Sequence, residues 1–270
     1  MAFELYRLEH GGYVRTEFRD LDDKPFWCRL GNKKEKAFVK FSKKHPFGHT
    51  VAIHPAKTAN PYHPDLLVDG RDIGEVKTKN SPLFLGWSHG VDPQFALTMD
   101  LKDSFNYCRW LARGVDLQIF AWVKWEVHRM IRDGRTYDVK PMAGVWLARF
   151  SDLRKKETSA NPPAIHWYRE KFRRPTEHCG DGWAAELIRF EPRLQIGNRS
   201  GAPVARNVSS DGFLEADGVR HPAGQSSGSY VFDLSDTGLF QKLDVARPKS
   251  WKTRLSDLLR RFRQQPRQQA

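Results

Sequence analysis

The stretch HPDLLVDGRDIGEVKTK, residues 63–79, contains two apolar runs that are separated by a strong turn signal. Residues 66–68 and 73–76 are rich in aliphatic side chains, which favours strands. The Asp69-Gly70 pair between the runs is typical of tight turns, because both residue types tolerate a positive φ angle. The stretch therefore predicts a β-hairpin.

The register of this hairpin decides which side chains meet. With a loop of three residues (69–71) or of five (68–72), Asp65 lies opposite Glu75, with Cβ atoms about 5 Å apart. A two-residue loop would place the two carboxylates on opposite faces. Glu75 and Lys77 share a face in every register, because side chains alternate along a strand.

Two carboxylates that converge on one point repel each other unless a cation lies between them. Magnesium suits such a place, because it takes oxygen ligands from one or two carboxylates and completes an octahedron with water and phosphate. Lys77, beside that ion, could orient or help to deprotonate an attacking water and offset the charge of a phosphate. These groups are the ones that hydrolysis of a phosphodiester bond requires.

Pro64-Asp65, followed after nine residues by Glu75-Val76-Lys77, resembles the motif of the PD-(D/E)XK nuclease superfamily. The motif is short and also occurs by chance in ordinary β-hairpins. An ordinary hairpin with a surface glutamate and lysine is the competing interpretation, so the surroundings carry the specificity.

The segments around the motif follow the element order of the superfamily's core. Residues 31–45 predict a short helix that carries Glu35. Residues 92–113 have apolar side chains at helical spacing, beginning at an Asp-Pro pair and ending before Gly114. Residues 115–125 are typical of a buried strand.

The resemblance covers roughly residues 30–126. It implies an α/β fold with a restriction-endonuclease-like mixed β-sheet core that is flanked by helices. It also implies that Asp65 and Glu75 bind Mg²⁺, which Mn²⁺ can replace, and that Lys77 is the catalytic lysine. Glu35 is a weaker match to a further metal ligand, because its bland interpretation is a solvated helix face.

Asp103 and Tyr107 resemble the Gln-x-x-x-Tyr helix of some exonuclease branches, but aspartate replaces glutamine here. Endonuclease action is therefore favoured. The predicted activity is that of a Mg²⁺-dependent deoxyribonuclease that leaves a 5′-phosphate and a 3′-hydroxyl, as the resemblance implies.

The chain of 270 residues has 45 Lys and Arg against 32 Asp and Glu, a formal net charge of +13. Such an excess indicates a polyanionic partner. Nucleic acid is the leading candidate, because basic side chains displace counterions from its phosphates. DNA is the predicted partner. The residues expected to contact it are Lys79, Arg169, Lys171, Arg173, Arg174, Arg260 and Arg261.

Each basic segment also has a structural interpretation. A lysine at a strand end, such as Lys79, is often only solvated. Residues 165–175 interleave aromatic and basic side chains, which suits base stacking but equally an amphipathic helix. Between 246 and 270 eight Lys or Arg accompany one Asp, and residues 251–262 have a helical apolar stripe. This basic amphipathic helix could pack on the rest of the protein, bind DNA or a protein partner, or bind an anionic membrane.

Composition divides the chain into two parts. Residues 1–150 are the expected PD-(D/E)XK-like nuclease core, and residues 164–270 are an irregular C-terminal extension that ends in the basic amphipathic helix. The polar segment 151–164 ends in two prolines and predicts a loop or linker. Residues 197–228 are rich in Gly and Ser, which predicts long loops.

Other features restrict the class of protein. No run approaches the roughly 20 apolar residues that cross a bilayer, and no signal-peptide pattern opens the chain. We expect a cytoplasmic protein without a membrane partner. Three widely separated cysteines argue against a disulfide framework or a zinc ribbon. Phosphate-loop, dinucleotide, nucleophile-elbow and zincin motifs are absent, which excludes those classes.

A metal-dependent DNA endonuclease is thus the favoured function. The alternative is a non-catalytic nucleic-acid-binding protein that uses its basic tail, with the hairpin only structural. A third possible function is that of a scaffold or membrane-surface protein that uses the terminal helix. Because nucleases with one site per chain often dimerise to cut both strands, a homodimer or an accessory protein is an expected partner.

Overall fold

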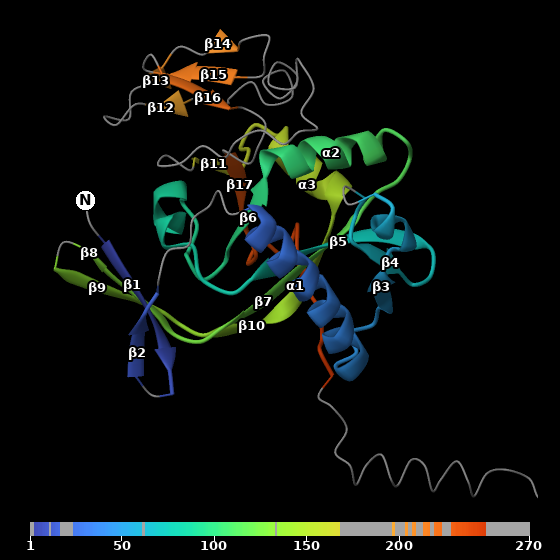
Figure 1. The fold of residues 1–270 in the computed structure, drawn as a ribbon, viewed down its shortest axis with the longest axis horizontal. Helices are drawn as coiled ribbons and strands as arrows, with labels where there is room; N and C mark the ends of the chain where they lie inside the picture. The colour runs from blue at the N-terminus through green and yellow to red at the C-terminus, as the bar shows by residue number, and fades with distance from the viewer. Residues whose placement is uncertain are drawn as a thin grey trace, which may run out of the picture.

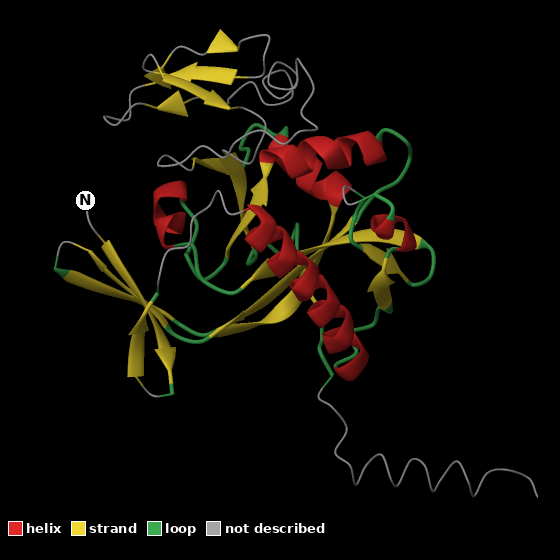
Figure 2. Ribbon diagram, in the orientation of Figure 1, coloured by secondary structure: helices red, strands yellow, loops and turns green. Residues whose placement is uncertain are grey.

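The computed structural model describes residues 3–10, 12–16, 24–60, 63–132, 134–167 and 228–246, together with short strands between 196 and 222. The fold is α/β, with mixed and antiparallel sheets and few helices (Figures 1 and 2).

A six-stranded mixed sheet forms the centre, with the strand order β18-β10-β7-β5-β4-β3. Strands β5 and β7 are parallel, and every other neighbouring pair is antiparallel. A parallel pair requires a crossover connection, which places helix α2 between β5 and β7 in the chain. The strands are β3 Val51–Ile53, β4 Leu66–Val68, β5 Asp72–Lys79, β7 Gln118–Trp125, β10 Met142–Arg149 and β18 Gln241–Lys242.

Helix α1, Lys24–Lys44, covers one face of this sheet, and Figure 1 shows it crossing in front of the strands. Phe38 is fully buried at the centre of this contact. Its ring centroid lies 5.7 Å from those of both Phe47 and Phe120. The predicted helix over 31–45 is confirmed, and it begins earlier than predicted.

Helix α2, Leu101–Leu111, packs on the opposite face. The helix predicted over 92–113 is wrong in its first part, because Ala96–Asp100 forms strand β6. This strand pairs with β17, Gly228–Asp233, far later in the chain. Long-range pairing here overrides local helical spacing. The C-terminal end agrees with prediction, since Gly114 follows the helix with a φ of 80°.

Helix α3, Phe150–Glu157, lies in the first half of segment 151–164, so the prediction of a loop there is wrong. Phe150 is fully buried in the core beneath α2. The Ser104 hydroxyl on α2 donates a hydrogen bond of 2.6 Å to the Glu157 carboxylate. A polar sequence forms a helix here because one of its faces is buried and its buried acid is paired.

The remaining strands form smaller sheets. The sheet of order β2-β1-β8-β9 contains β1 Phe3–Glu9, β2 Gly12–Arg15, β8 His128–Arg132 and β9 Arg135–Val139. In a three-stranded sheet, β17 lies between β6 and β11, Ala164–Trp167. The last two sheets are formed by β12 Ile196–Gly197 with β13 Pro203–Val204, and by β14 Asn207–Val208, β15 Phe213–Ala216 and β16 Val219–Pro222. Two short 3-10 helices are η1 Pro55–Thr58 and η2 Phe84–His89.

The last two described strands, β17 and β18, pair with strands that lie much earlier in the chain. Strand β17 pairs with β6, and β18 pairs with β10. The division into 1–150 and 164–270 stays a prediction, and the basic helix predicted near the C-terminus lies outside the described residues. None of the described helices has the length and apolar character that crossing a membrane requires.

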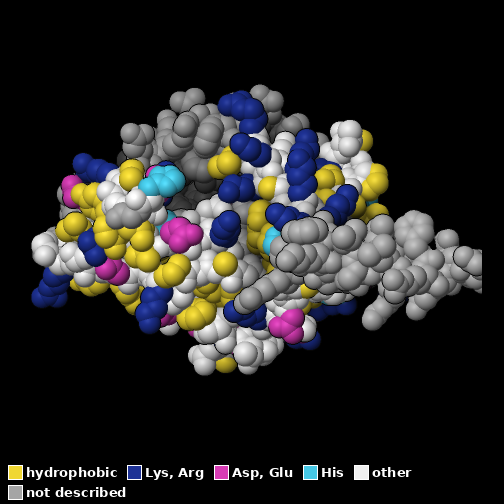
Figure 3. Space-filling model, turned by 90° about the horizontal axis from the view of Figure 1, so that it is seen from below, with side chains coloured by type: hydrophobic (Ala, Val, Ile, Leu, Met, Phe, Trp, Pro, Cys, Tyr) yellow, Lys and Arg dark blue, Asp and Glu magenta, His cyan; other side chains and the backbone are white. Residues whose placement is uncertain are grey.

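Basic side chains are spread over the surface. Figure 3 shows Lys and Arg side chains, in dark blue, over more of this face than the Asp and Glu side chains in magenta. The positive balance of the composition is therefore displayed outward on this face.

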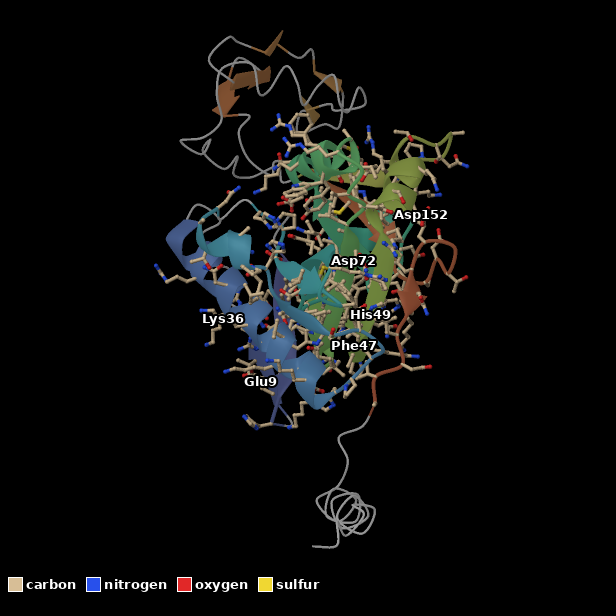
Figure 4. All side chains as sticks on the ribbon, turned by 90° about the vertical axis from the view of Figure 1, so that its right-hand side faces the viewer. Glu9, Lys36, Phe47, His49, Asp72 and Asp152 are labelled. Atoms are coloured by element: carbon tan, nitrogen blue, oxygen red, sulfur yellow. The ribbon has the colours of Figure 1, made fainter. Side chains whose placement is uncertain are left out.

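Replacement of Phe38 tests the contact between α1 and the sheet. Phe38→Ala removes a fully buried ring, so the free energy of unfolding should fall by about 3–5 kcal/mol. Urea denaturation followed by circular dichroism measures it. Lys36→Ala on the exposed side of α1 (Figure 4) is the matched control and should change stability little. Equal stability of the two variants would contradict this account of the core.

Candidate active site

The hairpin at residues 63–79 has the register that brings the acidic residues together. Val68 pairs with Asp72, which leaves the three-residue loop 69–71. Asp69 and Gly70 have φ angles of 50° and 74°, as the turn signal predicts. Of the loop lengths that the sequence left open, the structure has the three-residue one, so Asp65 and Glu75 share one side of the sheet.

The β4–β5 ladder ends early, and the site lies at the edge that remains open. Leu66 and Gly74 form the last pair, so β5 has no β4 partner from Glu75 onward. The Val76 N–H at this open edge donates instead to Asp65 Oδ2, at 3.3 Å. The Asp65 N–H in turn donates to Glu75 Oε2, at 3.2 Å. Each carboxylate is thereby fixed by a backbone group of the neighbouring segment.

Helix α1 contributes a third carboxylate. Glu35 precedes the buried Phe38 by three residues, so both lie on the helix face that is turned to the sheet. Glu35 Oε1 lies 2.8 Å from Lys57 Nζ, and the same ammonium group contacts Asp65 Oδ1. Lys57 therefore bridges the acid on the helix and the acid on the hairpin.

The backbone of η1 holds Lys57 in this position. The His54 N–H donates to the Asp65 carbonyl at 2.9 Å, which ties the start of η1 to the start of β4. His54 Nδ1 accepts the Ala56 N–H at 3.2 Å and so caps the short helix. Lys57 was not among the predicted site residues, because no local motif marks it and only the tertiary fold brings it to Asp65.

Lys77 links the hairpin to helix α2. Its Nζ lies 3.1 Å from Glu75 Oε1 and 2.7 Å from Asp103 Oδ2. The same ammonium lies 5.4 Å from the ring centroid of Tyr107. Small Ala121 is its partner on β7. The two residues that resemble the Gln-x-x-x-Tyr helix, Asp103 and Tyr107, are thus both brought to the predicted catalytic lysine.

The surroundings keep Lys77 protonated. Burial by itself lowers the pKa of Lys77, but the negative charges of Asp103 and Glu75 outweigh it and hold the pKa well above the usual range. Burial raises the pKa of Tyr107, and its phenol stays neutral. At neutral pH Lys77 can donate hydrogen bonds and offset negative charge. It is not a base.

The ion pairs of the site contain more acid than base. Four carboxylates, those of Glu35, Asp65, Glu75 and Asp103, share two ammonium groups, so the formal excess is two negative charges. Hard carboxylate oxygens together with this excess fit a divalent cation such as Mg²⁺. Within the described residues, however, no group of three or more His, Cys, Asp or Glu is spaced to hold a metal as it stands. Lys57 already lies between two of the acids.

Lys79 lies two residues beyond Lys77 on the same face of β5, because side chains alternate along the strand. The structural interpretation of Lys79 as a solvated side chain at a strand end is wrong, since the residue is only 9 % exposed. Among the described residues no hydrogen-bond or ion-pair partner is found for it. Burial lowers its pKa to about 8. An unpaired buried amine beside the site is costly for stability, which is typical of a group kept for binding.

Six further basic residues are predicted to contact DNA. Arg169, Lys171, Arg173, Arg174, Arg260 and Arg261 lie outside the described residues. The four predicted catalytic and metal-binding residues, Glu35, Asp65, Glu75 and Lys77, come together in one network, and their roles stay predictions.

Replacement of Lys79 should stabilise the protein in a pH-dependent way. Below about pH 8 the Lys79 ammonium is buried in the folded protein but exposed to water in the unfolded chain, which lowers the free energy of unfolding. This loss of stability fades as the pH rises from about 8 to 10.5, because Lys79 becomes neutral first in the folded protein and then in the unfolded chain. Lys79→Met should therefore raise the free energy of unfolding by about 3 kcal/mol at neutral pH, with a gain that fades toward pH 10.5.

Urea unfolding at a series of pH values measures this difference against the wild type. Lys36→Met removes an exposed charge from α1 and should give a difference near zero at every pH. A Lys79→Met variant that is no more stable than the wild type at neutral pH would show that the buried ammonium has a compensating partner.

Comparison with known proteins adds no family to this description. No family model, no curated protein and no solved structure matches the chain. The resemblance to PD-(D/E)XK nucleases therefore rests on the motif and on the residues gathered around it.

Proposed function

We propose that the chain is a metal-dependent nuclease that hydrolyses phosphodiester bonds of DNA, as an endonuclease. One observation carries the proposal. Glu35, Asp65, Glu75 and Lys77 converge on one open strand edge, with an excess of negative charge, in a protein whose net charge is +13. A polyanion would be drawn to the protein as a whole, whereas this acidic point needs a cation before a phosphate can approach it.

The arrangement of elements supports a restriction-endonuclease-like core. The hairpin β4–β5 is followed by α2 and then by β7, which pairs parallel with β5. Helix α1 lies on one face of this sheet, and α2 and α3 lie on the other. Apart from the additional strands β3 after α1 and β6 before α2, this is the order of helix, strand, strand, helix and strand that the resemblance implies.

Each site residue has a role that its contacts support. Asp65 and Glu75 would hold Mg²⁺ or Mn²⁺, with Glu35 as a third carboxylate. A bound divalent ion would polarise the scissile phosphate and lower the pKa of a bound water. Lys77, which stays protonated, would orient the attacking water by hydrogen bonding and offset charge on the phosphate. Asp103 would hold Lys77 in place.

Contacts to DNA would come from basic side chains outside the acidic point. Lys79 is nearest in sequence, on the face of β5 that carries Glu75 and Lys77. Its amine, which has no partner among the described residues, would gain a phosphate as its partner. The basic residues between 169 and 174 and at 260–261 would add contacts that are independent of sequence.

Loss of the site residues should abolish cleavage but leave binding intact. Asp65→Asn, Glu75→Gln and Lys77→Met keep the size of each side chain. Each should slow nicking of supercoiled plasmid in Mg²⁺ or Mn²⁺ by at least about a hundredfold, because each removes charge at the reacting phosphate. EDTA should stop the wild type. Agarose gels follow the cleavage, and fluorescence anisotropy follows the binding.

Asp152→Asn is the control for loss of one carboxylate, because the Asp152 side chain on α3 is 44 % exposed and its ion-pair partner among the described residues is Lys155 (Figure 4). It should cleave like the wild type. The nuclease proposal would be contradicted if the wild type bound DNA but cleaved it with neither Mg²⁺ nor Mn²⁺. Full cleavage activity of Asp65→Asn would also contradict it.

One observation favours a second function, that of a non-catalytic nucleic-acid-binding protein. Lys57 and Lys77 each bridge two carboxylates, so ion pairs within the chain already link these acids. In that case the hairpin would be structural, and the basic segments would supply the affinity.

Removal of the terminal basic pair tests where that affinity arises. If Arg260 and Arg261 each neutralise a phosphate, the double Arg→Ala variant should lose about two units from the slope of log K against log salt concentration. Anisotropy titrations over a salt series give the slope. The variant Arg71→Ala, in the exposed β4–β5 turn, should lose none. An unchanged slope in the double variant would place the contacts elsewhere.

A further inference from the structure

We propose that the Lys57 ammonium is an internal counterion which occupies the cation position of the site and must leave before a divalent metal can bind. This inference rests on the proposed function, because it concerns the same carboxylates. According to this inference, Lys57, which lies outside the sequence motif, controls the metal affinity of the site.

The contacts of Lys57 are the first support. Its Nζ lies 2.8 Å from Glu35 Oε1 and contacts Asp65 Oδ1, two oxygens on separate elements that a bridging metal would also use. The side chains of Lys57 and Glu35 are each only 14 % exposed. Neither charge is therefore well solvated, and the ion pairs are stronger than surface pairs.

The geometry of the acids is the second support. Glu35, Asp65 and Glu75 come together, yet no cluster of three acidic or histidine ligands within the described residues is spaced for a metal. A lysine between two of them accounts for this spacing. An ammonium donates one hydrogen bond to each acid, whereas a metal needs several oxygens directed at one point.

Simultaneous occupancy is unfavourable. A divalent ion bound by Asp65 would lie close to an ammonium that contacts the same carboxylate, and like charges repel strongly where solvent is largely excluded. The Lys57 ammonium can move away once a metal has taken over its two carboxylates, because its charge lies at the end of a flexible four-carbon stem. The released ammonium is then available to a substrate phosphate.

Lys77 is the internal comparison. It also bridges two carboxylates, but one of them is Asp103 on α2, which is not among the predicted ligands. Lys77 can keep Asp103 as its partner when Glu75 turns to a metal. Among the described residues Lys57 has no such second partner, since both acids that it contacts are predicted ligands.

Metal affinity without DNA tests the inference. Isothermal titration calorimetry with Mn²⁺ alone, on the full chain, should show that Lys57→Met binds about tenfold tighter than the wild type. Lys57→Arg, which keeps the charge, should bind like the wild type or more weakly. Lys36→Met, which removes a neighbouring exposed charge from α1, should change the affinity little. Circular dichroism verifies that each variant is folded.

A measurement on the unaltered protein covers the case in which Lys57→Met does not fold. In lysine-ammonium NMR spectra, saturating Mg²⁺ should shift the Lys57 signal away from its ion-paired position, while the Lys77 signal keeps its pairing to Asp103. Assignment uses the Lys57→Arg variant.

The outcomes separate the two proposals. Tighter Mn²⁺ binding by Lys57→Met, with a displaced Lys57 signal, supports the inference. Equal Mn²⁺ affinity in the wild type and in Lys57→Met, or an unmoved signal at saturation, overturns it and leaves the nuclease proposal standing. Absence of Mn²⁺ binding in the wild type and in every variant overturns both.

Discussion

Electrostatic repulsion among carboxylates is the constraint on which the site and its surroundings depend. Glu35, Asp65, Glu75 and Asp103 come from helix α1, the hairpin and helix α2, and the fold brings them into one network. Buried acids are tolerated only when they are paired and hydrogen-bonded. Two lysines and two backbone N–H groups meet part of this need, and the negative charge that remains is the basis of the proposed cation site.

The early end of the β4–β5 ladder creates the space in which this network forms. From Glu75 onward β5 pairs only with β7, and the freed Val76 N–H is used by Asp65 instead of by a strand. An open strand edge normally invites association with another chain. Here the carboxylate of Asp65 covers it, so the same feature that interrupts the sheet also positions a predicted ligand.

Three lysines around this edge show how environment gives one residue type different roles. Lys57 bridges two predicted ligands, and we propose that it exchanges with a metal. Lys77 is held between Glu75 and Asp103, and its raised pKa keeps it charged. Lys79 is buried without a partner among the described residues, and its pKa falls to about 8. Stability lost at such a position is typical of functional sites, where local rules are broken for the sake of binding.

The sequence by itself determined the hairpin and the shared face of Glu75 and Lys77, because turn chemistry and strand alternation are local properties. It left loops of two, three and five residues open, and the paired strands of the folded sheet decided for three and so placed Asp65 beside Glu75. The sequence also located α1. Only the tertiary structure decided that 96–100 is a strand and that Lys57 bridges Glu35 and Asp65. Both depend on partners distant in the chain, whose pairing energy exceeds any local preference and leaves no periodic signal in the sequence.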